Sequence, residues 1–322
     1  MRFRSMILVT AVLVFLGETT AQDTDYGAGY QTMIMRNPSF SGTAGDGILR
    51  VSYMNFYPGN NYNLHSFYVS YDSYFPVLHG GAGFCLANDH MGGIVNDMRG
   101  YISYAYFLQA DRDFYINAGL SAGFHHRGFS MGNAVFPDEI DRLGAITGFT
   151  SEPFENLNRT LFDISTGFLF LWKKWIAGVS VSHLTGPDLG RQGQPESRLE
   201  RSFHIQVAGD IDLSPDHEMK LRPVGMMDLQ DKYAYGGAGA VLESTNISAS
   251  VVALADNNGD LDIQPGFTIK TGKIMFFYNY RFNLKSGNDI LPFSLMHQTG
   301  ISLILNNVEK RLGSETIKIP RM

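Results

Sequence analysis

The stretch "FLFLWKKWIAGVSVSHL", residues 168–184, can be used to distinguish a helical fold from a β fold. It can be interpreted either as a membrane helix interrupted by two lysines or as two strands joined by a lysine turn. In residues 161–172 the even positions are almost all apolar, whereas the odd positions are mixed and include Asp163. A period of two is typical of a strand, and a helix would spread the charged residues around its circumference. The stretch is therefore predicted to be a β-hairpin that turns at Lys173 and Lys174.

The same alternation recurs along the chain. It is clear in residues 114–124, 202–212 and 273–282, where one face is apolar and the other carries polar or small residues. Strands of about ten residues with this pattern are typical of a transmembrane barrel, whereas the strands of a soluble sandwich are usually shorter. We find fourteen candidate strands, and an even number is typical of bacterial single-chain barrels. Their predicted starts are residues 47, 62, 79, 98, 113, 161, 174, 202, 218, 233, 246, 262, 273 and 295.

These observations predict an all-β fold, a transmembrane antiparallel β-barrel of about 14 strands. In the opening hairpin, Phe168 and Val179 lie on the predicted lipid face, and Ser165 and Ser180 lie on the predicted lumen face. Pro223 falls inside a candidate strand. Since proline cannot donate a hydrogen bond to the ladder, it predicts a bulge or a strand end at that position.

The predicted connections alternate between short and long along the chain. Residues 127–160 and 185–200 form the two longest connections. In bacterial barrels the short turns face the periplasm and the long loops face outward. We therefore predict that these two loops are extracellular, and that the Lys173-Lys174 turn and both chain termini are periplasmic.

The only two tryptophans, Trp172 and Trp175, flank Lys173 and Lys174. A two-residue turn at the periplasmic rim would place both indole rings at the level of the lipid headgroups, with the lysines reaching the aqueous boundary. The alternative is a soluble hairpin with an aromatic pair and a charged turn. The strand pattern of the whole chain favours the first interpretation, a membrane girdle made of these four residues.

The chain begins with the features of a secretory signal peptide. Arg2 and Arg4 precede an apolar run over residues 6–16, and the sequence "GETTAQ" follows. That apolar run is too short to span a bilayer as an anchor. The predicted organisation is a signal peptide (1–21), a periplasmic N-terminal segment (22–46), the outer-membrane β-barrel (47–306) and a periplasmic C-terminal tail (307–322).

Composition narrows the classes of function. Removing the signal peptide takes two arginines and Glu18 from 25 basic and 31 acidic residues, which leaves 23 against 30 and a net charge of −7. A mildly acidic chain without a basic run argues against nucleic acid as a partner. Cys85 is the single cysteine, so no intramolecular disulfide can form, and it lies far from the signal cleavage site of a lipoprotein.

No motif in the sequence carries recognisable chemistry. The acidic stretch 256–262 is similar to a calcium loop, but Phe267 stands where a bidentate glutamate belongs, so a polar hairpin loop is the better interpretation. His125 and His126 are adjacent on a predicted strand and point to opposite faces, so they cannot chelate one metal ion. We predict no metal, no cofactor and no enzymatic activity. An enzyme site assembled at the rim from distant Ser, His and Asp residues is the alternative.

Four segments, residues 37–53, 70–93, 178–190 and 294–305, resemble the PorP/SprF family of type IX secretion system membrane proteins. The resemblance covers nearly the whole mature chain. Where the family often has Arg-Asn-Gln-Trp-Pro-Gly, residues 54–59 read "MNFYPG". The residues that match the family motifs are Asn37, Pro38, Phe40, Gly42, Tyr71, Asp72, Asn88, Asp89, Gly92, Gly93, Ser182, His183 and Leu184.

The resemblance implies a non-enzymatic outer-membrane barrel of a Bacteroidota-type bacterium. Such proteins work with the periplasmic type IX machinery, and some retain an exported adhesin or gliding-motility filament that carries a C-terminal sorting domain. The alternative is a pore or a hydrophobic-substrate transporter related to fatty-acid channels. The Asn37-Pro38 pair is similar to the amino-terminal hatch of those channels. However, the 25 residues of the segment 22–46, which precedes the first strand at Gly47, are few for a substantial plug in the lumen.

Overall fold

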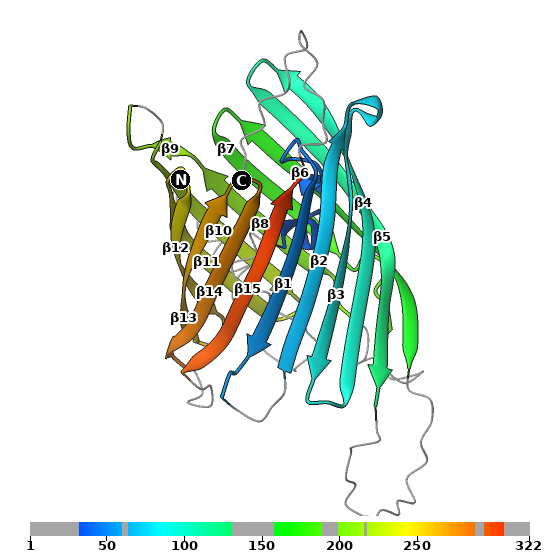
Figure 1. Ribbon diagram of the computed structural model, residues 1–322. Coiled ribbons are helices and arrows are strands. Elements are labelled where there is room, and N and C mark those ends of the chain that lie inside the picture. The colour runs from blue at the N-terminus through cyan, green and yellow to red at the C-terminus, as the bar shows by residue number, and fades with distance from the viewer. Residues whose placement is uncertain are drawn as a thin grey trace, which may run out of the picture.

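The protein is a closed antiparallel β-barrel (Figure 1). The structure, a computed structural model, describes residues 32–59, 64–130, 158–188, 199–215, 218–286 and 293–305. The helical elements and strands are α2 (Met33–Arg36), η1 (Pro38–Phe40), β1 (Ile48–Phe56), β2 (Leu64–Phe75), η2 (Pro76–Leu78), β3 (Gly80–Met91), β4 (Val95–Asp111), β5 (Phe114–Phe129), β6 (Arg159–Trp172), β7 (Trp175–Ser182), β8 (Ser202–Gly209), β9 (Ile211–Asp212), β10 (Lys220–Gln230), β11 (Tyr233–Glu243), β12 (Ile247–Asp256), β13 (Leu261–Thr271), β14 (Ile274–Lys285) and β15 (Ser294–Ile304).

Neighbours in sequence are neighbours in the sheet, and two pairings close it. β15 pairs with β1, and β10 pairs with β11. β8 and β9 both pair with β10, one beyond the other, so together they form a single interrupted strand. The fifteen strands therefore make a barrel of fourteen, as the sequence predicts. No helix in the part of the chain that the structure describes is long and apolar enough to cross a membrane.

The strand boundaries confirm the predicted pattern. No predicted start differs from the observed one by more than three residues, and that largest difference is at β4, which begins at Val95 rather than at residue 98. The reason is a tight turn. Gly92 and Gly93 adopt left-handed conformations, with φ of 65° and 74°, so β3 and β4 pair almost up to their connection.

The two faces of the opening hairpin are also as predicted. Phe168 and Val179 pair across β6 and β7 and point out of the barrel, with 46% and 42% of their surfaces exposed. Ser165 and Ser180 point inward and are only 3% and 4% exposed. The alternation therefore separates an apolar outer face from an interior of polar and small residues, the arrangement expected of a barrel in lipid.

Pro223 lies inside β10, which neither ends nor bulges there, and the strand end near it belongs instead to the neighbouring strand, between β8 and β9. On one side it pairs with Ala240 of β11. On the other side Pro223 has no pairing partner, because it falls between the end of β8 at Gly209 and the start of β9 at Ile211. The N–H group that proline lacks is therefore not needed for a ladder hydrogen bond on that side. Asp210, the residue at the break, accepts hydrogen bonds from Arg222, with 2.6 Å between Nε and Oδ1.

The connections between strands emerge at two opposite rims. The Lys173-Lys174 turn lies at the rim where β1 starts and β15 ends, and the long connections after β5 and β7 leave from the other rim. Residues 131–157 and 189–198 of those connections, the predicted signal peptide and the predicted tail lie outside the described residues. β4 and β5 are the longest of the described strands, with 17 and 16 residues, and their hairpin projects beyond β3 at the rim where β1 starts (Figure 1).

Candidate functional site

Residues 32–46, here called the strap, lie inside the barrel (Figure 1). The sequence explains their local shape. Asn37 is extended, and its side-chain Oδ1 accepts a hydrogen bond from the backbone N–H of Ser39 at 3.0 Å, which caps the turn η1. Pro38 occupies the first position of that turn, where proline is favoured. Phe40 then packs against inward-facing apolar residues of β6 and β7.

Hydrogen bonds fix the strap to one side of the inner wall. The Asn37 side-chain amide donates to the backbone carbonyls of Phe168 (3.4 Å) and Val179 (3.5 Å), on β6 and β7. The Ser180 hydroxyl donates to the carbonyl of Arg36 at 2.8 Å. These bonds satisfy polar groups that are shielded from water, so they hold the strap in a defined position.

The second half of the strap is bound to β2 and β4. The backbone N–H of Gly42 donates to the Asp72 carboxylate at 2.8 Å, and the hydroxyls of Ser41 and Ser103 are 2.7 Å apart. Asp72 also accepts from Arg50 at 2.5 Å. The structure thus brings together family-motif residues from two distant segments of the sequence.

Glycines in the wall make room for the strap. A Cβ atom on Gly119 would overlap the backbone nitrogen of Ser39, and one on Gly81 would overlap the carbonyl oxygen of Ser41. The sequence did not predict this close approach of two backbones. Glycine inside a strand is the signal that could have indicated it. That part of the predicted segment 22–46 packs in the lumen is therefore a finding of the structure, and the boundary itself stays a prediction.

An ion pair extends the contacts of the strap to β10. Arg36 lies 2.8 Å from Asp228, which also lies 2.8 Å from Nδ1 of His204, and Nε2 of His204 lies 3.3 Å from the Ser182 hydroxyl. The order Ser, His, Asp is that of a hydrolase triad. Here, however, the aspartate is shared with an arginine of the strap, and Ser182 is buried. The chain of contacts connects the strap with β10, β8 and β7.

The motif at 182–184 also anchors the end of β7. His183 adopts a left-handed conformation, with φ of 59°, and its Nδ1 lies 2.7 Å from the buried Asp163 carboxylate. The same carboxylate accepts hydrogen bonds from the hydroxyls of Tyr101 and Thr185, both at 3.0 Å. The backbone N–H of Leu184 donates to Ile164. Because hydrogen bonds to a charged group are strong, this buried carboxylate stabilises the position of the end of β7.

The remaining motif residues lie apart from the strap, along β2 and β3 and in the turn after β3. Asp89 forms a buried ion pair with Arg99 at 2.5 Å. The Asn88 amide lies 3.2 Å from the His90 ring, and Tyr71 packs against an aromatic ring of β3. The motif residues therefore fall into separate structural clusters rather than one site.

The predicted girdle residues lie together at the rim. Trp172 and Trp175 pair directly across β6 and β7 and are 56% and 45% exposed on the outer face. Nζ of Lys173 lies 5.5 Å from the centre of the Trp172 ring. Lys174 forms an ion pair with Asp212. The contact of these side chains with lipid headgroups stays a prediction.

The candidates for metal binding serve local structure. Asp256 accepts hydrogen bonds from the backbone N–H groups of Asn258 and Asp260, both at 2.9 Å, which closes the turn between β12 and β13. His125 points inward and His126 outward, where it contacts Thr160 at 2.6 Å. Within the described ranges, no group of three or more His, Cys, Asp or Glu side chains is placed to hold a metal ion.

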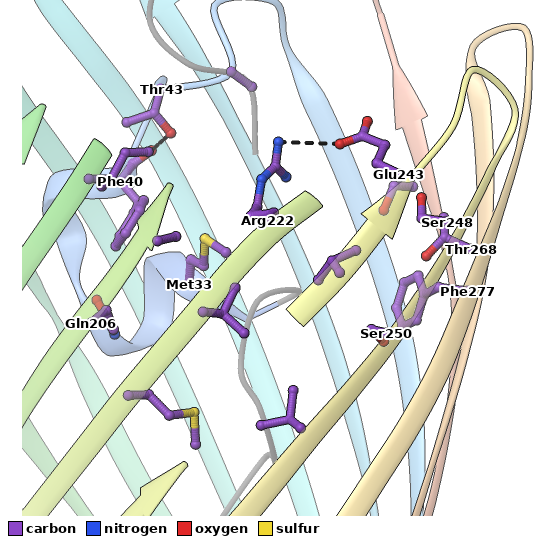
Figure 2. A pocket seen from close by; sticks show the side chains of 18 of the residues that line it. Met33, Phe40, Thr43, Gln206, Arg222, Glu243, Ser248, Ser250, Thr268 and Phe277 are labelled. Carbon is purple, nitrogen blue, oxygen red and sulfur yellow. Dashed lines mark hydrogen bonds and ion pairs between the residues drawn. The ribbon is translucent and has the colours of Figure 1, made fainter. Parts of the chain in front are cut away.

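A cavity of about 230 Å³ lies between the strap and the opposite wall of the barrel (Figure 2). Met33 and Phe40 border it from the strap. Apolar side chains of β10, β12 and β14 face them across the space, including Val224, Val252 and Phe277. The strap therefore covers one side of the lumen and leaves a space on the other.

The comparisons with known proteins agree with the fold. The family described as "Type IX secretion system membrane protein PorP/SprF" matches residues 18–294. No curated protein matches the chain. Similar solved structures are the CymD monoaromatic hydrocarbon channel (11% identity, 88% of this chain and 94% of that chain, TM-score 0.50) and Omp33 of Acinetobacter baumannii (7%, 82% and 100%, TM-score 0.47). At such low identity the likeness to CymD supports the fold alone.

Proposed function

The chain belongs to the PorP/SprF family of type IX secretion system membrane proteins, and from this membership we propose that it retains an exported surface protein at the cell surface and couples it to the secretion machinery. The fold and the family make it a component of the bacterial outer membrane. The proposed partner is a large protein of adhesin or filament type with a C-terminal sorting domain. The proposed binding surface is the rim opposite the lysine turn, with its long loops extracellular.

One observation carries this proposal, namely that side-chain hydrogen bonds join the ends of β4 and β5, and the residue before β6, at that rim. Arg127 donates two hydrogen bonds to Asp97, at 2.8 and 2.6 Å. The Asn158 side chain accepts from the backbone N–H of Phe129 at 2.8 Å, so the two ends of the longest connection are tied together. Loops on a rigid frame are common places for recognition, and a fixed base lowers the entropy lost on binding.

A pore or transporter for hydrophobic molecules is the second candidate, because the lumen contains a cavity beside the strap. The strap weighs against an open channel. It is fixed by hydrogen bonds and an ion pair to five strands, β2, β4, β6, β7 and β10. A solute that crosses the side of the lumen that the strap occupies would have to displace these contacts, whereas a binding role requires no movement.

Shortening the connection after β5 tests the proposed binding surface. We expect that a short Gly-Ser linker in place of residues 132–156 releases the exported partner into the medium while the barrel still assembles. The measurement is surface proteomics together with heat-modifiable gel mobility. The control is the same linker in place of residues 287–292, at the same rim. Retention of all surface proteins by the 132–156 variant would refute the assignment of this loop.

Cysteine labelling tests the orientation. In a Cys85→Ser background, Asp138→Cys is expected to react with a membrane-impermeant maleimide on intact cells, whereas Lys173→Cys is expected to react only after the outer membrane is permeabilised. Residue 138 lies outside the described residues, and Lys173 lies in the turn at the opposite rim. Labelling of residue 173 on intact cells would reverse the proposed topology.

A further inference from the structure

The cavity beside the strap is amphipathic. Its interior is lined mainly by apolar side chains from the strap and the wall, such as Met33, Val224 and Val252, and Arg36, Gln206 and Ser250 also border it. Toward the rim where β1 starts, the lining becomes polar, with Ser248, Thr268, Arg222 and Glu243 (Figure 2). Arg50, near the start of β1, also lines the cavity at this end. A space with an apolar interior and a polar end suits a molecule that is itself amphipathic.

The two arginines at the polar end differ in how their charge is compensated. Arg222 contacts two carboxylates, those of Asp210 and Glu243. For Arg50 the structure gives one hydrogen bond among the described residues, from NH1 to Asp72, although a guanidinium has five donor hydrogens. The other oxygen of Asp72 accepts from the backbone N–H of Gly42 in the strap. Arg50 thus retains donors that can bind an anion at the edge of the cavity.

From this arrangement we infer that the cavity is a binding site for a small carboxylate with one apolar body, a single ring or a short chain. The carboxylate accepts hydrogen bonds from Arg50, and the apolar body lies between the strap and β10–β14. The cavity of about 230 Å³ exceeds the ~150 Å³ of an engineered cavity that holds benzene and is below the ~300 Å³ at which drug-sized pockets begin. This inference does not depend on the proposed role in surface retention.

The binding test uses the whole protein in lipid nanodiscs and isothermal titration with para-propylbenzoate. The matched probes are its alcohol and amine analogues, and empty nanodiscs give the blank. We expect the carboxylate to bind saturably and about tenfold more tightly than the alcohol, because hydrogen bonds to a charged group are stronger than neutral ones. Absence of saturable binding would overturn the inference. Equal affinity for the alcohol would overturn the role of Arg50.

Two neighbouring positions on β11 locate the site. Val241 lines the cavity, whereas Leu242 points outward and is 41% exposed. Val241→Phe is expected to fill the space and abolish binding, and Leu242→Phe is expected to bind as the wild type does. Ser248→Leu, at the polar end, provides a second filling variant should Val241→Phe not assemble. Unchanged binding by an assembled filling variant would contradict the location.

A double variant tests the headgroup contact without leaving a buried charge unpaired. Arg50→Met combined with Asp72→Asn removes both charges and keeps an acceptor for the N–H of Gly42. We expect this variant to lose the preference for the carboxylate over the alcohol. A preserved preference would show that another group binds the anion.

Discussion

Arginine in place of Phe168 is expected to lower the free energy of unfolding by about 2–4 kcal/mol, the cost of a cationic side chain near the middle of the bilayer. Phe168 is a mid-strand residue of β6 that points out of the barrel and pairs with Ala118 and Val179. The measurement is urea-induced unfolding in lipid vesicles, followed by the fluorescence of Trp172 and Trp175.

The control for this prediction is arginine at a position inside the barrel. The sequence alone suggests Ser165 and Ser180, but both are buried, and the Ser180 hydroxyl donates to the strap, so arginine there would collide with packed atoms. Thr268 borders the cavity and has space beside it. We expect Thr268→Arg to lose much less stability than Phe168→Arg. Equal losses at both positions would mean that the outer face does not contact lipid.

Alanine in place of Gly119 is expected to loosen the strap. Its Cβ atom would overlap the backbone nitrogen of Ser39, and overpacking of this kind costs about 1–3 kcal/mol. Arg36, which is buried in the intact strap, should then become accessible to trypsin. We expect cleavage after Arg36 to be roughly tenfold faster, because proteolysis follows the population of the open form.

The matched control is Gly236→Ala on β11. A Cβ atom there meets its nearest neighbour, the carbonyl oxygen of Met226, at 3.5 Å, an ordinary contact. This variant should be cut after Arg36 as slowly as the wild type. If Gly119→Ala is also cut at the wild-type rate, the strap does not depend on its close approach to β5.

The barrel could be predicted from the sequence because its signal is local. Each strand carries its own alternation, as between Ser165 and Phe168, and each tight turn carries its own residues, such as Gly92 and Gly93. A break in the ladder beside Pro223 was predictable for the same reason, because a missing N–H group affects only its own pairing, but the break falls in the neighbouring strand and not in β10. The family could also be identified, because its motif residues lie in short contiguous segments.

The strap and the cavity could not be predicted, because they depend on contacts between distant parts of the chain. Asn37 binds the carbonyl of Val179, 142 positions away, and no local pattern encodes that contact. Glycines at positions 119 and 167 indicate small residues inside the barrel, but not what fills the space beside them. The cavity exists only because the strap covers one side of the lumen, which is a property of the assembled fold.

Deletion of the gene tests the proposed function most directly. The measurement compares surface proteomics of the deletion strain with its uptake of small solutes, and a strain complemented with the wild-type gene serves as the control. We predict that one or a few large exported proteins move from the cell surface into the medium while solute uptake is unchanged. Loss of uptake of a nutrient, with all surface proteins retained, would contradict the role in retention and support a transport function.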